Sequence, residues 1–325
     1  MYLLLPALLV LATTSSAAPG DGDWAAAYAK AATALAKLTN TNKVALVTGV
    51  GWQKGPCVGN TAAIPAIGYP QFCLQDGPLG VRYAQQVTAF PAGITTGSTW
   101  DTGLMYARQE AKALGVHNQL GPVAGPLGKI PTAGRNWEGF SNDPYLSGEA
   151  MRNELIINFN SRQSTVCKRQ ASKHAPNIIV SQLTDVPSSK VGVESNSKYT
   201  VGNEQELNRD TMSANINDRT THELYLWPFA EAVKANVTSV MCSYNKFNTT
   251  WSCENQALLT TLLKNELDFQ GYVVSDLDDV QTSKYIDGLH TDWAAQHTTV
   301  GSANAGLVSL TVDGDGSKVD EEYRI

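Results

Sequence analysis

The segment Phe269–Asp276 constrains the fold more than any other stretch of the chain. Its apolar run, Tyr272 to Val274, follows Gly271 and ends two residues before a carboxylate. Short β-branched and aromatic runs that follow a glycine are typical of a buried parallel strand. In a (β/α) barrel the carboxyl ends of such strands face the active site. Asp276 is therefore a candidate reacting group, although a Ser-Asp pair after a strand is also a common helix N-cap.

The segment Cys73–Arg82 repeats this arrangement. Apolar residues lead to Asp76, and a Gly-Pro turn follows, so Asp76 also lies at a predicted strand end. The alternative is an aspartate that only initiates the turn.

The segment Gly134–Phe140 combines a guanidinium, a tryptophan and a carboxylate in one turn. Arg135 can bind hydroxyls through parallel hydrogen bonds, and Trp137 offers a flat apolar surface. These are the parts of a sugar-binding pocket. The alternative is a buried pair of Arg135 and Glu138 packed under Trp137.

Strand-like and helix-like segments alternate along the chain, which indicates an α/β fold with a parallel sheet. We expect a (β/α)8 barrel of the TIM type, irregular and partly open. Helices are predicted at 23–38, with Asp23 as its cap, and at 101–114, 147–159, 219–235 and 255–267.

Composition excludes several functional classes. The 325 residues carry a net charge of −6 without a cluster of Lys or Arg, so nucleic acid is not an expected partner. After the N-terminus no apolar run is long enough to span a membrane. The cysteines and histidines lack metal-ligand spacing, so we predict neither a metal site nor a cofactor.

The N-terminal residues indicate export. Residues 1–18 form a short apolar run followed by small residues, as in a cleaved secretory signal, which leaves 19–325 as one domain. Asn236 and Asn248 begin N-glycosylation triplets. The five cysteines suggest two local disulfides in an oxidising compartment, pairing Cys57 with Cys73 and Cys242 with Cys253, and they leave Cys167 over.

Taken together, the ordered motifs resemble those of the secreted fungal β-glucosidases of glycoside hydrolase family three. The motifs include Gly49–Trp52, Cys73–Arg82, Gln119–Gly128, Gly134–Phe140, Asn203–Glu206, Val240–Asn245 and Gly271–Asp276. The resemblance implies a retaining exo-β-glucosidase that acts on cellobiose and related cello-oligosaccharides or β-glucosides. A β-xylosidase-type relative is the alternative within the same class.

The resemblance also implies roles for individual residues. The nucleophile falls on Asp276, and the contacts to the bound glucosyl unit fall on a set drawn from several strand ends: Asp76, Arg82, Arg135, Lys198, Met241 and Tyr244. Tyr244 is expected to orient the nucleophile. Retaining chemistry needs a second carboxylic acid about 5–5.5 Å from the first.

The chain departs from the family pattern in two internal segments. Lys198-Tyr199 aligns with an expected Lys-His, while Lys173-His174 looks like a second partial copy, and 163–191 reads as an insertion. A second insertion at 277–291 separates Asp276 from Asp292-Trp293, so Asp292 is the alternative nucleophile.

The third departure is the C-terminal tail. Residues 308–325 do not follow the family pattern, and the second α/β domain that supplies the family's acid/base glutamate is not recognised. We assign no acid/base residue in this chain, and specifically not Glu138, Glu204 or Glu206. The chain as written is expected to have little activity, and a non-catalytic glucose-binding remnant is the alternative. Oligomeric state is not predicted.

Overall fold

The computed structural model describes residues 24–47, 49–50, 54–77, 79–101, 108–125, 130–160, 193–275 and 304–306. The predicted signal, both insertions, the tail, Cys167, Lys173-His174 and both candidate nucleophiles, Asp276 and Asp292, lie outside the described residues. In the part of the chain that is described, no helix has the length and apolar character needed to cross a membrane.

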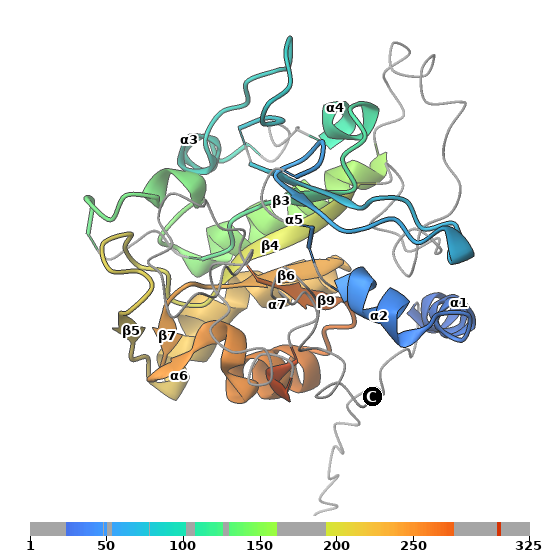
Figure 1. Cartoon of the computed structure of the whole chain (residues 1–325). Helices are drawn as coiled ribbons and strands as arrows, with labels where there is room; N and C mark the ends of the chain where they lie inside the picture. Colours follow the sequence, from blue (N-terminus) through green and yellow to red (C-terminus); the bar gives the residue numbers. More distant parts are fainter. Residues whose placement is uncertain are drawn as a thin grey trace, which may run out of the picture.

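A curled six-stranded sheet forms the centre of the described structure (Figure 1). The strand order is β1-β2-β3-β4-β6-β9, and every neighbouring pair is parallel except β1 with β2. The strands are β1 (Gly59–Asn60), β2 (Cys73–Asp76), β3 (Asn118–Leu120), β4 (Glu194–Thr200), β6 (Ser239–Cys242) and β9 (Tyr272–Val274). The sheet confirms the predicted α/β class as an open half-barrel.

Helices connect and cover these strands. The α-helices are α1 (Ala25–Leu35), α2 (Asn40–Val47), α3 (Gly93–Ser98), α4 (Arg108–Ala113), α5 (Pro144–Asn160), α6 (Asp218–Thr220) and α7 (Trp227–Lys234). The π-helices are η7 (Thr221–Leu226) and η9 (Ala257–Glu266), and the 3-10 turns are η2 (Pro65–Ile67), η4 (Asn136–Glu138) and η8 (Ser252–Glu254). A small second sheet joins β5 (Ser213–Ala214), β7 (Lys246–Phe247) and β8 (Thr250–Trp251).

The predicted strand ends at Asp76 and before Asp276 are confirmed as β2 and β9. Position 271, just before β9, requires glycine. A Cβ there would collide with the carbonyl oxygen of Thr238, in the segment that leads into β6. The predicted cap of the first helix is wrong: Trp24 occupies the N-cap position of α1 and provides no side-chain hydrogen bond.

Helices α5 and α7 pack closely on each other. A Cβ on Gly148 of α5 would lie 2.9 Å from the Glu231 side chain and 3.2 Å from the Trp227 ring, both on α7, so a larger residue would separate the helices. On α7, Phe229 is fully buried in the main hydrophobic core that also contains Val240 of β6 and Val273 of β9.

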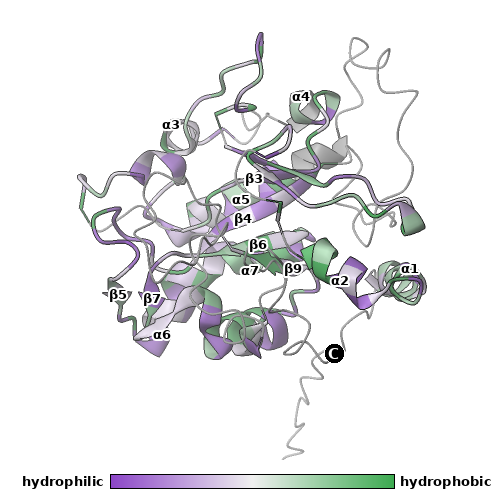
Figure 2. Cartoon of the chain, viewed as in Figure 1, coloured by the Kyte–Doolittle hydropathy of each residue, from purple (hydrophilic) through white to green (hydrophobic). Residues whose placement is uncertain are grey.

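Strand β4 was not predicted as a strand. Its seven residues are all buried, yet none is aliphatic, so the sequence lacks the apolar pattern of a central strand. Figure 2 shows the contrast between a largely hydrophilic β4 and the hydrophobic β6 and β9. The segment is a strand because of its tertiary surroundings: β4 pairs with β3 on one side and with β6 on the other.

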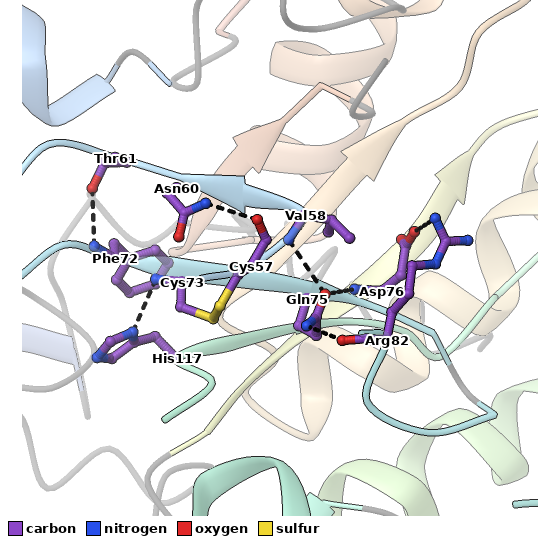
Figure 3. The surroundings of a disulfide bond; sticks show 10 residues. All are labelled: Cys57, Val58, Asn60, Thr61, Phe72, Cys73, Gln75, Asp76, Arg82 and His117. Atoms are coloured by element: carbon purple, nitrogen blue, oxygen red, sulfur yellow. Dashed lines mark hydrogen bonds and ion pairs between the residues drawn. A yellow bond between two sulfur atoms is a disulfide. The ribbon is translucent and has the colours of Figure 1, made fainter. Parts of the chain in front are cut away.

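Both predicted disulfides are confirmed. Cys57 and Cys73 join the segment before β1 to β2 with a Cα–Cα distance of 5.6 Å (Figure 3). Cys242 and Cys253 join the end of β6 to η8 with a Cα–Cα distance of 5.3 Å. The second bridge therefore closes the loop that contains Tyr244.

His117 should make the fold sensitive to acid. Burial, followed by the charge of Lys112, lowers the pKa of His117 to about 4, and its Nδ1 accepts a 2.9 Å hydrogen bond from the Cys73 amide (Figure 3). Because the folded pKa lies below the unfolded value, this contribution to stability is complete above pH 6.5 and is lost as the pH falls towards 4. Urea unfolding of wild type and His117→Gln across pH 4–7 measures the effect.

His222 has the opposite pH dependence. A hydrogen bond to the Asp218 carbonyl oxygen is the main cause that raises the pKa of His222, so its stabilising contribution declines as the pH rises. If wild type and His117→Gln lose stability equally on acidification, the assignment to His117 is wrong.

Candidate functional site

A cavity of about 580 Å³ lies at the carboxyl ends of β2 and β4. Five of the six predicted sugar-contacting residues line it, and they come from segments far apart in the sequence: Asp76, Arg82, Arg135, Lys198 and Tyr244. The carboxyl ends of the strands thus bring together five residues that are spread over about half of the sequence.

Asp76 is the last residue of β2, and its carboxylate lies between two cations. Arg82 Nη1 is 3.0 Å from Asp76 Oδ2, and Lys198 Nζ is 3.7 Å from Oδ1. Figure 3 shows Arg82 returning toward Asp76 through the loop after β2. That loop needs glycine at Gly77 and Gly80, whose φ angles are 106° and 137°.

The neighbours of Asp76 fix its geometry. The Gln75 side-chain amide donates a 2.8 Å hydrogen bond to the Arg82 carbonyl oxygen. The Lys198 side chain, at the end of β4, is only 3% exposed. A carboxylate has about four acceptor positions, so Asp76 retains lone pairs for hydroxyl groups of a ligand.

Arg135 forms the ion pair with Glu138 that the sequence offered as one alternative, and it also lines the cavity. It forms a two-bond pair with Glu138, with Nε–Oε1 at 2.6 Å and Nη2–Oε2 at 2.9 Å. Its guanidinium also lies 4.8 Å from the centre of the Tyr199 ring and lines the cavity. The carboxylate and the ring hold Arg135 in place, while Trp137, 39% exposed, lies on the same cavity wall.

Two lining residues, Tyr199 and Arg209, were absent from the predicted set. Arg209 stacks 3.8 Å from the centre of the Tyr244 ring and is held by Glu206 at 2.7 Å. Tyr199 is buried, and its ring centre lies 6.1 Å from that of Tyr244. The polar cluster of residues 204–210 was the available signal for Arg209, and the alignment of Lys198-Tyr199 with an expected Lys-His was the signal for Tyr199.

Met241 differs from the other predicted contacts. It is fully buried in β6, within the main core, and is not among the described residues that line the cavity.

Each of three glutamates near the site pairs with a neighbouring side chain. Glu138 binds Arg135, Glu206 binds Arg209, and the Tyr225 hydroxyl donates to Glu204. All three line a separate cavity of about 40 Å³ beside Arg135.

The lining of the larger cavity is rich in cations. Four cationic side chains, Arg82, Arg135, Lys198 and Arg209, face two carboxylates, Asp76 and Glu138. Such a lining favours a ligand that presents acceptor oxygens or negative charge. Within the described ranges no group of three or more His, Cys, Asp or Glu side chains could hold a metal ion.

The fold and the cavity together define an α/β half-barrel domain with a polar ligand site at the carboxyl ends of its parallel strands. The chain belongs to glycosyl hydrolase family 3, because the model of that family's N-terminal domain matches residues 65–307.

Similar proteins agree with this assignment. The chain is 51% identical over 312 residues to beta-glucosidase cel3A of Pyricularia oryzae, covering 94% of this chain and 36% of the relative. It is 52% identical to the probable beta-glucosidase L of Aspergillus terreus, covering 90% and 34%. The chain therefore spans about a third of the length of these relatives.

Solved structures give the same result. Beta-glucosidase D2-BGL from Chaetomella raphigera has a TM-score of 0.73 at 58% identity, covering 92% of this chain and 36% of that one. A Thermotoga neapolitana beta-glucosidase 3B, solved in complex with glucose, has a TM-score of 0.66 at 28% identity, covering 91% and 38%.

Proposed function

We propose that this chain is the glucosyl-binding barrel portion of a retaining exo-β-glucosidase. Its substrates are cellobiose and related β-glucosides with a terminal non-reducing glucosyl unit. The observation that carries the proposal is the Asp76 carboxylate held between Arg82 and Lys198 in the cavity at the strand ends. Relatives of about 50% identity are named beta-glucosidases.

Four of the lining residues have roles in this proposal. Asp76 accepts hydrogen bonds from vicinal hydroxyls, and Lys198 and Arg135 donate to hydroxyl oxygens. Tyr244, braced by the stacked Arg209, orients the nucleophile. Contacts to hydroxyls that strengthen in the oxocarbenium-like transition state increase the rate as well as the affinity.

Asp276 is the proposed nucleophile. It directly follows Ser275, which is fully buried after β9. Its carboxylate oxygen bonds to the anomeric carbon while the bond to the leaving oxygen breaks, and water later releases glucose. Asp292 remains the alternative.

Protonation of the leaving oxygen needs a second carboxylic acid, and we assign none among the described residues. Glucosides whose leaving group needs no proton therefore test the proposed role of Asp276 independently of that acid.

A mechanism-based label tests the proposal in the full chain. We expect 2,4-dinitrophenyl 2-deoxy-2-fluoro-β-glucoside to label the peptide that contains Asp276, and glucose to bind in calorimetry. Asp276→Asn should prevent labelling, whereas Asp292→Asn should not. Binding of glucose without labelling of either aspartate would select the non-catalytic remnant, and preferential binding of xylose would select the xylosidase-type alternative.

We also propose that the chain is secreted and glycosylated at Asn236 and Asn248. Asn248 lies on an exposed turn after β7, where its side chain also bonds to both backbone groups of Ile216 at 2.7 and 3.0 Å. Asn236 is half-buried just after α7. Mass spectrometry of secreted protein before and after deglycosylation tests both sites.

A further inference from the structure

A second polar cluster lies at the amino ends of the strands, opposite the cavity. Glu194 begins β4, and side chains from β3, β6 and β9 surround it. Tyr272 donates a 2.6 Å hydrogen bond to Glu194 Oε2, and Asn118 Nδ2 donates to the same oxygen at 3.2 Å. Asn118 and Asn196 both donate to Ser239 Oγ, at 2.9 and 3.0 Å.

Among the described residues, the cluster contains one carboxyl group and no cationic side chain. Glu194 is 3% exposed, and no ion pair joins it to any described residue. The titratable groups that face it are the phenols of Tyr272, from β9, and Tyr69, from the segment after η2, and burial raises the pKa of both. The flanking strands β3 and β6 contribute only Asn118 and Ser239.

The cluster also contains more acceptors than donors. Glu194 Oε1, Asn118 Oδ1 and Asn196 Oδ1 are buried, and none has a hydrogen-bond partner among the described residues. A buried acceptor without a donor destabilises the folded state, and an unpaired buried charge does so more strongly. A proton on Oε1 removes the charge and turns one unpartnered acceptor into a donor.

We propose that the folded domain holds Glu194 as the neutral carboxylic acid, and that ionisation of this group weakens the fold as the pH rises. Glu194 and Lys198 lie on the same short strand, so the same event acts on the element that carries a residue of the cavity.

The direction of the effect follows from the two states of the acid. Burial raises the pKa of Glu194 to about 7, and the hydrogen bonds from Tyr272 and Asn118 only partly oppose this. A folded pKa above the unfolded value means that the contribution is complete below about pH 4.5 and is lost as the pH rises through 7. His117 acts in the opposite direction over much of the same range.

Comparison of wild type with Glu194→Gln isolates Glu194, because the contribution of His117 is common to both proteins. Urea unfolding of the full chain from pH 4.5 to 8 measures the ratio of their folding equilibrium constants. We expect wild type to lose up to about tenfold per pH unit relative to Glu194→Gln between pH 5 and 7. Glu223→Gln, whose parent side chain is 63% exposed, should show no such relative change.

Two further measurements keep the proposal testable if Glu194→Gln fails to fold. Infrared spectroscopy of the wild type with labelled glutamate should show a protonated carboxylic acid at pH 5.5 that disappears above pH 8. Stability at pH 7 should be the same in sodium, potassium and choline chloride. Parallel pH profiles of wild type and Glu194→Gln, an ionised spectrum at pH 5.5, or a cation-specific gain in stability would each overturn the proposal.

Discussion

Replacement of Asp76 by asparagine should lower the affinity of the chain for glucose about 100-fold, because two charge-assisted hydrogen bonds to hydroxyls become weaker neutral ones. The change also leaves Lys198, 3% exposed, without its carboxylate partner. Titration calorimetry with glucose measures the affinity, and a thermal melt of the same sample verifies that the variant is folded.

Two controls separate binding from folding in this experiment. Asp218→Asn alters a side chain that is 93% exposed on α6 and should leave glucose affinity unchanged. The double variant Asp76→Asn/Lys198→Met removes the unpaired cation, so it should recover stability but not affinity. Unchanged glucose binding by folded Asp76→Asn would show that Asp76 does not bind the sugar.

Replacement of Phe229 by alanine should lower the free energy of unfolding by about 3–5 kcal/mol, because the change leaves a cavity in a closely packed core. Phe229 is fully buried on α7, in the main core that also contains Val240 of β6 and Val273 of β9. A loss of this size is a large share of the stability of an ordinary domain. Urea unfolding measures the loss.

Trp227 provides the matched control for Phe229 because it is a larger aromatic residue on the same helix but is 41% exposed. Trp227→Ala should cost clearly less than Phe229→Ala, and Phe229→Leu should cost less than about 1.5 kcal/mol because it retains most of the volume. Equal losses for Phe229→Ala and Trp227→Ala would mean that α7 is not anchored through Phe229.

The opposing titrations of His117 and Glu194 give the domain an unusual pH response. His117 favours the folded state above pH 6.5, and Glu194 favours it below pH 4.5. Between pH 4.5 and 6.5 the two contributions to the free energy of unfolding change in opposite directions, so in wild type they partly cancel. Substituting either residue should reveal the pH dependence that the other contributes.

The amino-acid sequence by itself determined the elements whose local pattern agrees with their final environment. Gly271 followed by an apolar run predicted β9, and the apolar lead into Asp76 predicted the end of β2, because these strands are buried and bounded by residues that punctuate structure locally. The disulfides followed for a similar reason, since each closes a short loop within one region of the chain.

Tertiary structure alone decided the position of β4 and the contacts made through it. No local pattern marks Glu194–Thr200 as a central strand, because its side chains are polar and become buried only when β3 and β6 pair on either side. That pairing places Lys198 beside Asp76 at one end and Glu194 beside Asn118 at the other. Burial and the approach of distant strands set both environments, and neither is encoded within a short window of sequence.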